Sequence, residues 1–299
     1  MRLTTYKLLL ASSLILSLAC ALAYAQAGRR TSSATSERDV LLNVFAARAD
    51  GSNNFVSAKD VSLFDGGVEQ TVKSFSPDPG PARIVLLVDN SLSLRADVEK
   101  LSVAVKEFAY EIYEGDQLMV VGYDEQPEIV NDWTDDAKKI EAALPTLRKR
   151  GEPHLFDALS AVINEALRPF SASNRKRTIV LIGDGLDRGS KTTFKEILEE
   201  LQAQDITLYS VQIQDRTGGA HRRDRPKPAQ AIQQLTEGTG GRSFSIKEAH
   251  DAAKSICDEL RKNRYILGYT PTSYGLTESR RLLLLAAEGI EIRTKTMIK

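Results

Sequence analysis

The chain has 299 residues, of which 42% are hydrophobic and 27% are charged. This is the balance of an ordinary globular protein, and the length suits one large domain or one domain with a smaller companion. Lysine and arginine together number 40, as do aspartate and glutamate, so the formal net charge is zero. The lack of a basic excess argues against a protein that coats nucleic acid.

The N-terminus has the features of a secretory signal. Two basic residues precede an apolar segment over 8–23, and Ala23-Tyr24-Ala25 places small residues where a signal peptidase reads them. A membrane anchor is the alternative, but the segment is short and rich in serine. We therefore expect residues 1–25 to be a signal peptide. The mature chain, with no membrane span, is then exported and is periplasmic or secreted.

Two cysteines bear on the state of the mature chain. Cys20 lies in the apolar segment, and the residues before it fit a lipid-attachment site poorly. Cleavage would leave Cys257 alone, so no intramolecular disulfide could form. The helical apolar pattern around Cys257 predicts a buried thiol. The polar stretch 26–39 is expected to be a flexible tether.

Two segments flanking the centre of the chain have the pattern of β-structure. Residues 40–79 contain runs rich in branched and aromatic residues, broken by the turn sequences ADGSNN and DGG. Residues 263–299 contain further apolar runs joined by a turn. Neither segment has enough apolar residues for its own core, so we expect the two to pack together as a small accessory β-subdomain. The proline-rich stretch 76–82 is expected to be a linker.

Residues 80–262 alternate apolar strands with amphipathic helices. This pattern predicts a doubly wound α/β domain, with a mostly parallel, Rossmann-like sheet covered by helices on both faces. A short strand over 127–131 is expected to add an antiparallel edge. The predicted strands are 84–88, 117–123, 177–183, 206–213 and 242–246, and the predicted helices are 95–113, 134–147, 154–168, 191–204, 228–239 and 247–262.

Oxygen-bearing side chains follow two of these strands. Asp89, Ser91 and Ser93 come directly after the first strand, and Asp184 follows the strand over 177–183. Ligands of an open α/β sheet bind beyond the carboxyl ends of the strands. Carboxylates and hydroxyls without a His or Cys cluster suit Mg²⁺, Mn²⁺ or Ca²⁺. Each motif alone is more often a helix cap or a turn, but their matching positions favour a metal site formed by all four residues.

The same residues carry a family resemblance. The sequence VLLVDNSLS resembles the Asp-x-Ser-x-Ser signature of von Willebrand factor A (VWFA) domains, and VLIGDGLD resembles their later Asp-Gly element. In that family these elements form the metal-ion-dependent adhesion site (MIDAS), where a carboxylate of the partner completes the coordination of the metal. The resemblance implies that an acidic group on a protein partner binds at this site.

Further segments extend the resemblance to residues 38–299. VSLFDGGVEQTVKSF, HLFDAL and YILGY look like the VWFA-related domain family of exported acidobacterial proteins. Membership would imply the doubly wound fold, no catalytic activity, and a role in binding or adhesion.

The sequence departs from the family pattern at one position. The family has a threonine four residues before the aspartate of HLFDAL, and here this position is Pro153, which has no hydroxyl. Glu152 and His154 flank it and could reach into the site, but we expect both to be surface residues. We therefore expect a divalent ion, if bound, to be held more weakly than in a complete site. Asp187 is expected to be a turn residue or an outer acceptor, and Asp124 to lie in a hairpin turn.

Three classes of function remain to be compared. The leading one is a non-enzymatic binding module that uses the metal site. The second is a structural scaffold with a vestigial site, which Pro153 favours. The third is an enzyme, but no phosphate-binding glycine loop is present and the three histidines lie away from plausible nucleophiles. The basic loop 215–228 is expected to be a solvated loop rather than an anion-binding surface. The identity of the partner and the oligomeric state stay open.

Overall fold

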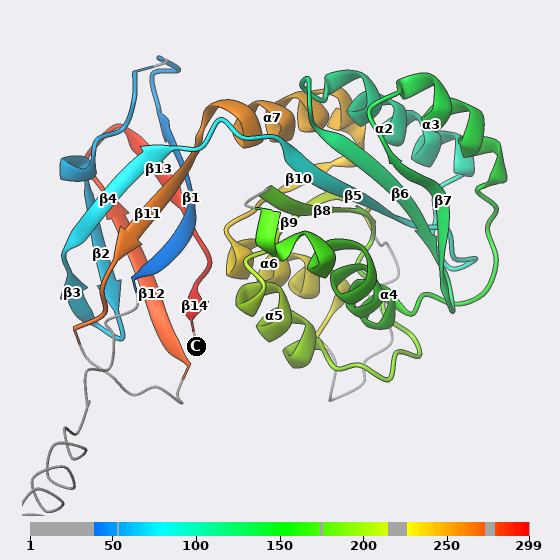
Figure 1. Cartoon of the computed structure of the whole chain (residues 1–299). Coiled ribbons are helices and arrows are strands. Elements are labelled where there is room, and N and C mark those ends of the chain that lie inside the picture. The colour runs from blue at the N-terminus through cyan, green and yellow to red at the C-terminus, as the bar shows by residue number, and fades with distance from the viewer. Residues whose placement is uncertain (1–38, 53, 174–175, 215–225, 273–278, 299) are drawn as a thin grey trace, which may run out of the picture. The chain divides into compact units, whose positions relative to one another are not determined.

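A computed structural model describes residues 39–52, 54–173, 176–214, 226–272 and 279–298. Its centre is a six-stranded sheet in the order β10-β9-β8-β5-β6-β7 (Figure 1). All neighbouring pairs are parallel except β6 and β7, so β7 is the antiparallel edge that the sequence predicted. The strands are β5 (Ala82–Asp89), β6 (Gln117–Tyr123), β7 (Pro127–Thr134), β8 (Lys176–Gly183), β9 (Thr207–Gln212) and β10 (Ser243–Ser245).

Helices cover both faces of this sheet. Helices α2, α3 and α7 pack on one face, and α4, α5 and α6 pack on the other, each set against its own buried apolar cluster (Figure 1). The predicted doubly wound fold is therefore confirmed. The helices are α2 (Val98–Glu111), α3 (Ala137–Ala143), α4 (Leu155–Ala161, continued by a π-helical segment Val162–Leu167), α5 (Phe194–Ala203), α6 (Pro228–Thr239) and α7 (Ala249–Lys262).

Three helices, α2, α3 and α5, begin three residues later than the apolar pattern predicted. Helix α2 begins at Val98 because the side chain of Asp97 accepts a hydrogen bond from the amide of Lys100, at 3.0 Å. Helix α5 begins at Phe194 because Thr193 and Glu196 form a capping box. Capping side chains satisfy amides that have no partner within the helix, so the cap sets the first residue.

The accessory β-subdomain contains two four-stranded sheets. Strand β11 lies between β1 and β4 in the first sheet, and β12 lies between β14 and β2 in the second. Apolar residues of both sheets form one shared core. The predicted packing of the flanking segments is confirmed, although the domain boundaries stay a prediction. The strands are β1 (Val40–Arg48), β2 (Val61–Asp65), β3 (Val68–Gln70), β4 (Val72–Pro77), β11 (Arg264–Tyr269), β12 (Arg280–Ala286), β13 (Ile290–Arg293) and β14 (Met297–Ile298).

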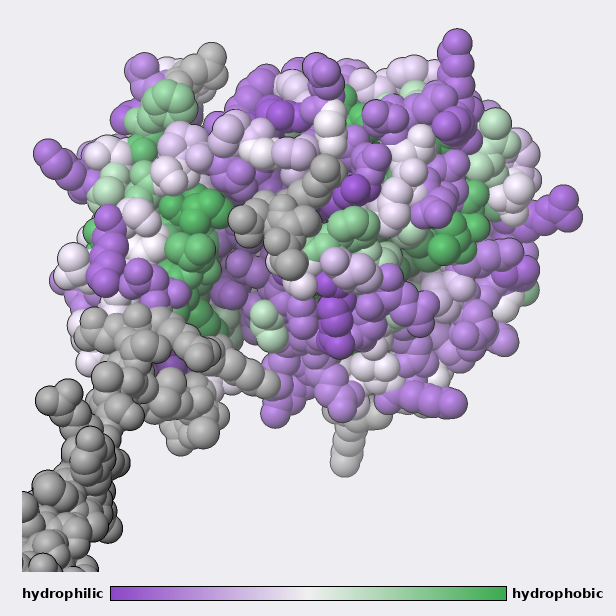
Figure 2. Space-filling view, in the orientation of Figure 1, coloured by the Kyte–Doolittle hydropathy of each residue, from purple (hydrophilic) through white to green (hydrophobic). Residues whose placement is uncertain are grey.

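The surfaces of the two regions differ in character. Figure 2 shows hydrophobic residues gathered in a strip over the β-strands, whereas the face of the α/β domain in this view is mostly hydrophilic. Exposed leucines on these strands include Leu41, Leu283 and Leu285. None of the helices in the described ranges is long and apolar enough to cross a membrane. Cys257 is buried, as predicted, and burial raises the pKa of its thiol.

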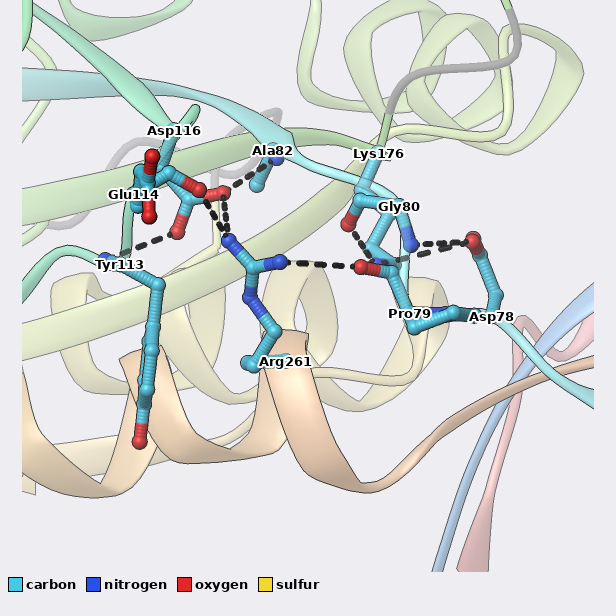
Figure 3. A network of polar contacts seen from close by, with 9 residues as sticks. All are labelled: Asp78, Pro79, Gly80, Ala82, Tyr113, Glu114, Asp116, Lys176 and Arg261. Carbon is cyan, nitrogen blue, oxygen red and sulfur yellow. Dashed lines mark hydrogen bonds and ion pairs between the residues drawn. The ribbon is translucent and has the colours of Figure 1, made fainter.

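The linker between β4 and β5 is shorter than the predicted 76–82, because β4 continues through Pro77 and β5 begins at Ala82. A network of polar contacts holds it (Figure 3). The buried carboxylate of Asp116 accepts hydrogen bonds from the amide of Ala82, at 2.7 Å, and from the guanidinium of Arg261, at 3.4 Å. The end of this short connection at Ala82 is thus tied to the α/β domain.

Two basic side chains make further contacts with the linker. Arg261 also donates to the carbonyl of Pro79, at 3.1 Å, and the ammonium of Lys176 donates to the carbonyl of Gly80 (Figure 3). Lys176 lies 3.7 Å from the carboxylate of Asp78. Burial lowers the pKa of Lys176 to about 8, and the charge of Asp78 opposes this shift.

A buried glutamate joins α7 to the C-terminal strands. Glu259 is 1% exposed, and its carboxylate accepts hydrogen bonds from the hydroxyl of Tyr209 and from the guanidinium of Arg293, the latter at 2.7 Å. The guanidinium of Arg242 lies 3.6 Å away. Because Arg293 belongs to β13, this cluster connects the accessory sheets to the α/β domain.

Removal of residues 263–299 should expose the amides of β1 to rapid hydrogen exchange. Strand β1 pairs with β11 from Val40↔Tyr269 to Phe45↔Arg264 and with β13 on its other side. The truncation removes both neighbours, and an unpaired strand is not stable in water. Exchange measured by mass spectrometry on peptides from β1 and β5 tests this. Unchanged protection of β1 would show that the N-terminal segment is held independently.

Candidate metal centre

The two predicted carboxylates meet at the carboxyl edge of the sheet. Strands β5 and β8 are parallel neighbours in register up to Val88↔Ile182, so Asp89 ends one strand beside the last residue of the other. Asp184 directly follows β8. Because residue 183 is a glycine, the side chain of Asp89 can lie close to the backbone of β8. A Cβ atom at Gly183 would lie only 2.9 Å from the Cβ of Asp89. Asp89 and Asp184 therefore lie at the same edge of the sheet, where the charge of one acts on the other.

The environment of Asp89 disfavours its negative charge. The residue is 1% exposed, and its Oδ2 has no hydrogen-bond partner among the described residues. Burial raises the pKa of Asp89 to about 7, and the negative charge of Asp184 adds to the shift. Hydrogen bonds from Ser91, including one from its amide at 2.9 Å, act in the opposite direction but do not cancel it.

The serines of the loop after β5 lie beside this carboxylate. Ser91 is fully buried and Ser93 is half-buried, and their hydroxyl oxygens are 3.1 Å apart. The amide of Ser91 is bound to Asp89, which turns the loop back over the strand end. The structure thus brings Ser91 and Ser93 together and links Ser91 directly to Asp89. The negative charge of Asp184 acts on Asp89, and Oδ1 of Asp184 accepts a hydrogen bond from the amide of Leu186, at 2.9 Å.

A second loop, residues 148–154, lies along the serine loop. The amide of Arg150 donates to the carbonyl of Asn90, at 2.9 Å, and the amide of Leu92 donates to the carbonyl of Gly151, at 3.1 Å. Pro153, which is buried, lies in this loop. Its carbonyl accepts from the amide of Arg188, at 2.7 Å, which joins the loop to the segment after Asp184.

The residues that flank Pro153 have other contacts. Glu152 is exposed and forms an ion pair with Arg188, at 3.1 Å. The imidazole of His154 lies against Gly189, where an added Cβ would be 2.1 Å from its Nε2. Glu152 is thus a surface residue, as expected, whereas His154 is partly buried.

Asp187 and Ser190 cap helix α4 from another loop. The hydroxyl of Ser190 accepts from the amides of Phe156 and Asp157, each at 3.1 Å, and donates to Asp187. Asp187 also accepts from the amide of Phe156, at 3.3 Å. Asp187 thus accepts hydrogen bonds from the first turn of a helix and from the serine that caps it. Nothing in the local sequence indicates the role of Ser190, because its partners lie more than 30 residues away.

Asp157 holds the loop before α5. Its carboxylate accepts from the hydroxyl of Thr192, at 2.7 Å, and from the amides of Lys191 and Thr192. Burial alone would raise the pKa of Asp157, but these hydrogen bonds outweigh it and hold the pKa below its usual value. The aspartate of HLFDAL thus has a structural role that sequence reasoning did not assign.

Asp124 lies in the predicted hairpin turn, where its side chain accepts from the amide of Gln126, at 3.1 Å. It also forms an ion pair with Arg150, at 2.6 Å. Its carboxylate is therefore occupied in holding the second loop and is not available to the site.

The four predicted ligands fit a hard divalent cation. Across the described ranges, no three His, Cys, Asp or Glu side chains form a cluster that could hold a metal ion. A site here must therefore combine carboxylates with hydroxyls and water, as Mg²⁺ sites do. A cation would also offset the cost of placing Asp89 and Asp184 side by side with little solvent.

Comparison with known proteins identifies part of the chain. Residues 84–186, which include all four predicted ligands, match the family model described as von Willebrand factor type A domain. No curated protein matches the chain.

Several solved structures have a similar fold. An aerotolerance-related membrane protein from Bacteroides fragilis has 15% identity and a TM-score of 0.46, covering 60% of this chain and 99% of its own. BatB from Bacteroides thetaiotaomicron has 15% identity and a TM-score of 0.45, covering 60% and 97%. Proximal thread matrix protein 1 from the mussel byssus, with a zinc-occupied MIDAS motif, has 15% identity and a TM-score of 0.48, covering 66% of this chain and 49% of its own. Because these values are low, we draw no functional conclusion from the likenesses.

Proposed function

We propose that this protein is a non-enzymatic binding module in which Asp89, Ser91, Ser93 and Asp184 hold one divalent cation. The cation, Mg²⁺ in the first instance with Mn²⁺ and Ca²⁺ as alternatives, engages an acidic group on a protein partner. The signal sequence over 1–25, which lies outside the described residues, supports export to the periplasm or beyond. The VWFA match over 84–186 supports a role in protein interaction.

One observation carries the proposal. Asp89 is buried beside a second carboxylate, and its Oδ2 lacks a hydrogen-bond partner within the described residues. An ionised carboxylate in such a place is costly unless it is paired or coordinates a metal. The cation would supply positive charge for an anionic ligand. The hydroxyl oxygens of Ser91 and Ser93 would be neutral ligands of the cation, so they would leave part of its charge uncompensated.

The mouth of the site has a feature suited to a protein partner. Leu92 lies between the two serines and is 66% exposed, while its amide is fixed to the carbonyl of Gly151. An exposed leucine on a fixed loop offers apolar contact beside the cation. This arrangement supports a macromolecular ligand over a small anion, although a single exposed leucine is common on protein surfaces.

A structural scaffold with a vestigial site is the second candidate. It is favoured by Pro153, which is buried at the position where the family pattern has a threonine and which provides no side-chain oxygen. The two candidates differ in one measurable property, the binding of a divalent ion.

Replacing Pro153 with threonine should tighten the binding of Mg²⁺ or Mn²⁺. One added hydroxyl ligand is expected to contribute on the order of 1 kcal/mol, comparable to a hydrogen bond to a charged group. Asp89→Ala should abolish binding. Glu152→Ala is the matched control and should have no effect, since Glu152 pairs with Arg188 on the surface. Titration calorimetry on the four proteins decides, and if wild type and Pro153→Thr bind no divalent ion, the scaffold candidate stands.

A further inference from the structure

We infer that the acidic group bound at the metal site belongs to a segment of the partner with several acidic residues, because three loops that are joined to one another at this edge of the sheet carry exposed cations. This inference rests on the proposed function. We call Arg95, Arg148 and Lys191 together the basic rim. All three are exposed, and none of them forms an ion pair within the part of the chain that the structure describes.

Backbone contacts fix the loops of the basic rim to one another. The carbonyl of Arg148 accepts from the side chain of Asn90, the residue after Asp89, at 3.1 Å. Lys149 donates to the carbonyls of Leu94 and Ala96, on either side of Arg95. The loops that carry Arg95 and Arg148 therefore lie side by side at the end of β5.

The third loop joins the other two on the side of Asp184. Its Arg188 amide is bound to the carbonyl of Pro153, at 2.7 Å, in the loop that carries Arg148. The amide of Lys191 is bound to Asp157 at the start of α4. The backbones that carry the three rim cations are thus held in place, whereas their charged ends extend to solvent.

Other basic residues of these loops already have partners. Arg150 pairs with Asp124 and Glu128, and Arg188 pairs with Glu152. The ammonium of Lys149 is engaged by backbone carbonyls. The exposed acidic residue nearest to Arg95 in sequence, Asp97, lies 3.9 Å from the ammonium of Lys100.

The three cations of the basic rim outnumber the exposed carboxylates of Glu99 and Glu125, which lie on adjoining segments, so a positive charge remains on these loops. A divalent cation would compensate the two buried carboxylates, and the basic rim adds exposed positive charge around it. A single partner carboxylate would be satisfied by the cation. The rim cations are complementary to further carboxylates on either side of that group, and such complementarity raises association rates and is screened by salt.

Two fluorescent peptides test this inference: one of about 12 residues with alternating glutamate and serine, and one of the same length with a single glutamate among serines. Binding is followed by anisotropy in Mg²⁺. At an ionic strength of about 50 mM, the glutamate-rich peptide should bind wild type about tenfold more tightly than the other. At about 300 mM salt, the difference should shrink because exposed charges are screened. The triple variant Arg95→Ala, Arg148→Ala, Lys191→Ala should lose the difference.

The matched control is the triple variant Lys138→Ala, Lys139→Ala, Arg281→Ala, which removes the same charge at exposed residues outside these loops and should bind like wild type. Calorimetry with Mg²⁺ alone separates the two proposals. If Mg²⁺ binds but the two peptides bind equally, the inference is wrong and the proposed function stands. If Mg²⁺ does not bind, both fail. Binding of the glutamate-rich peptide that persists in EDTA and is displaced by dextran sulfate would indicate a general polyanion surface and would also overturn the inference.

Discussion

Replacing Asp89 with asparagine should stabilise the metal-free protein at about pH 8, by on the order of 4 kcal/mol, while it abolishes metal binding. Burial and the charge of Asp184 raise the pKa of Asp89 to about 7. Asparagine retains an oxygen that can accept from the amide of Ser91, and it carries no charge. Asp89, which the metal site requires, is thus expected to lower the stability of the folded protein when no cation is bound.

The pH dependence follows from the direction of the shift. Between about pH 4 and pH 7 the unfolded chain loses the proton of Asp89, whereas the folded protein keeps it. The contribution of Asp89 to the free energy of unfolding therefore falls as the pH rises through this range and is constant above it. The advantage of Asp89→Asn should be absent near pH 4 and complete near pH 8.

Urea denaturation in excess EDTA at the two pH values measures this. Asp97→Asn is the control, because Asp97 is exposed and asparagine caps a helix as well as aspartate does. An equal stability difference at both pH values would show that the ionised carboxylate of Asp89 is not its cause.

Replacing Glu259 with leucine should destabilise the protein by about 3–5 kcal/mol, since breaking a buried ion pair leaves its partner charge uncompensated. The variant would leave Nη2 of Arg293 and the hydroxyl of Tyr209 without their acceptor. The effect should be largest on the accessory sheets, because Arg293 belongs to β13.

Glu291→Ala provides the comparison for this prediction. Glu291 also pairs with Arg293, at 3.1 Å, but its side chain is 52% exposed. Exposed pairs contribute between about 0 and 1 kcal/mol, so this variant should be nearly neutral. Chemical denaturation of both variants gives the two values. Similar losses of stability in Glu259→Leu and Glu291→Ala would mean that burial of the ion pair does not determine its contribution to the free energy of unfolding.

The strands and the convergence of Asp89 with Asp184 could be predicted from the sequence for a physical reason. A fully buried parallel strand is a continuous apolar run, so its end is visible where the first carboxylate appears. Once two such strands are neighbours, their carboxyl ends must meet at one edge. Local composition and simple topology were sufficient for this part of the site.

The support around the site could not be predicted in this way. Ser190 caps a helix that begins 35 residues earlier in the chain, and Asp157 holds the loop before α5. Such contacts depend on how distant loops fold over the sheet edge, and they leave no periodic pattern. The start of α2 at Val98 was missed for a simpler reason, because Leu94 and Ala96, before the residue that caps the helix, are buried against the same core as the helix itself.

The linker between β4 and β5 and the candidate metal site lie at opposite ends of β5, so a force on the site would act along this strand. Strand β5 is paired at seven positions with β6 and at seven with β8. A pulling force applied to Asp89 along the strand would load both ladders in shear, so the bonds on both flanks would have to break together. The tension would then reach Ala82, which Asp116 holds, and pass through the linker into β4. The central strand of the sheet is thus a tension-bearing element between the binding edge and the accessory sheets.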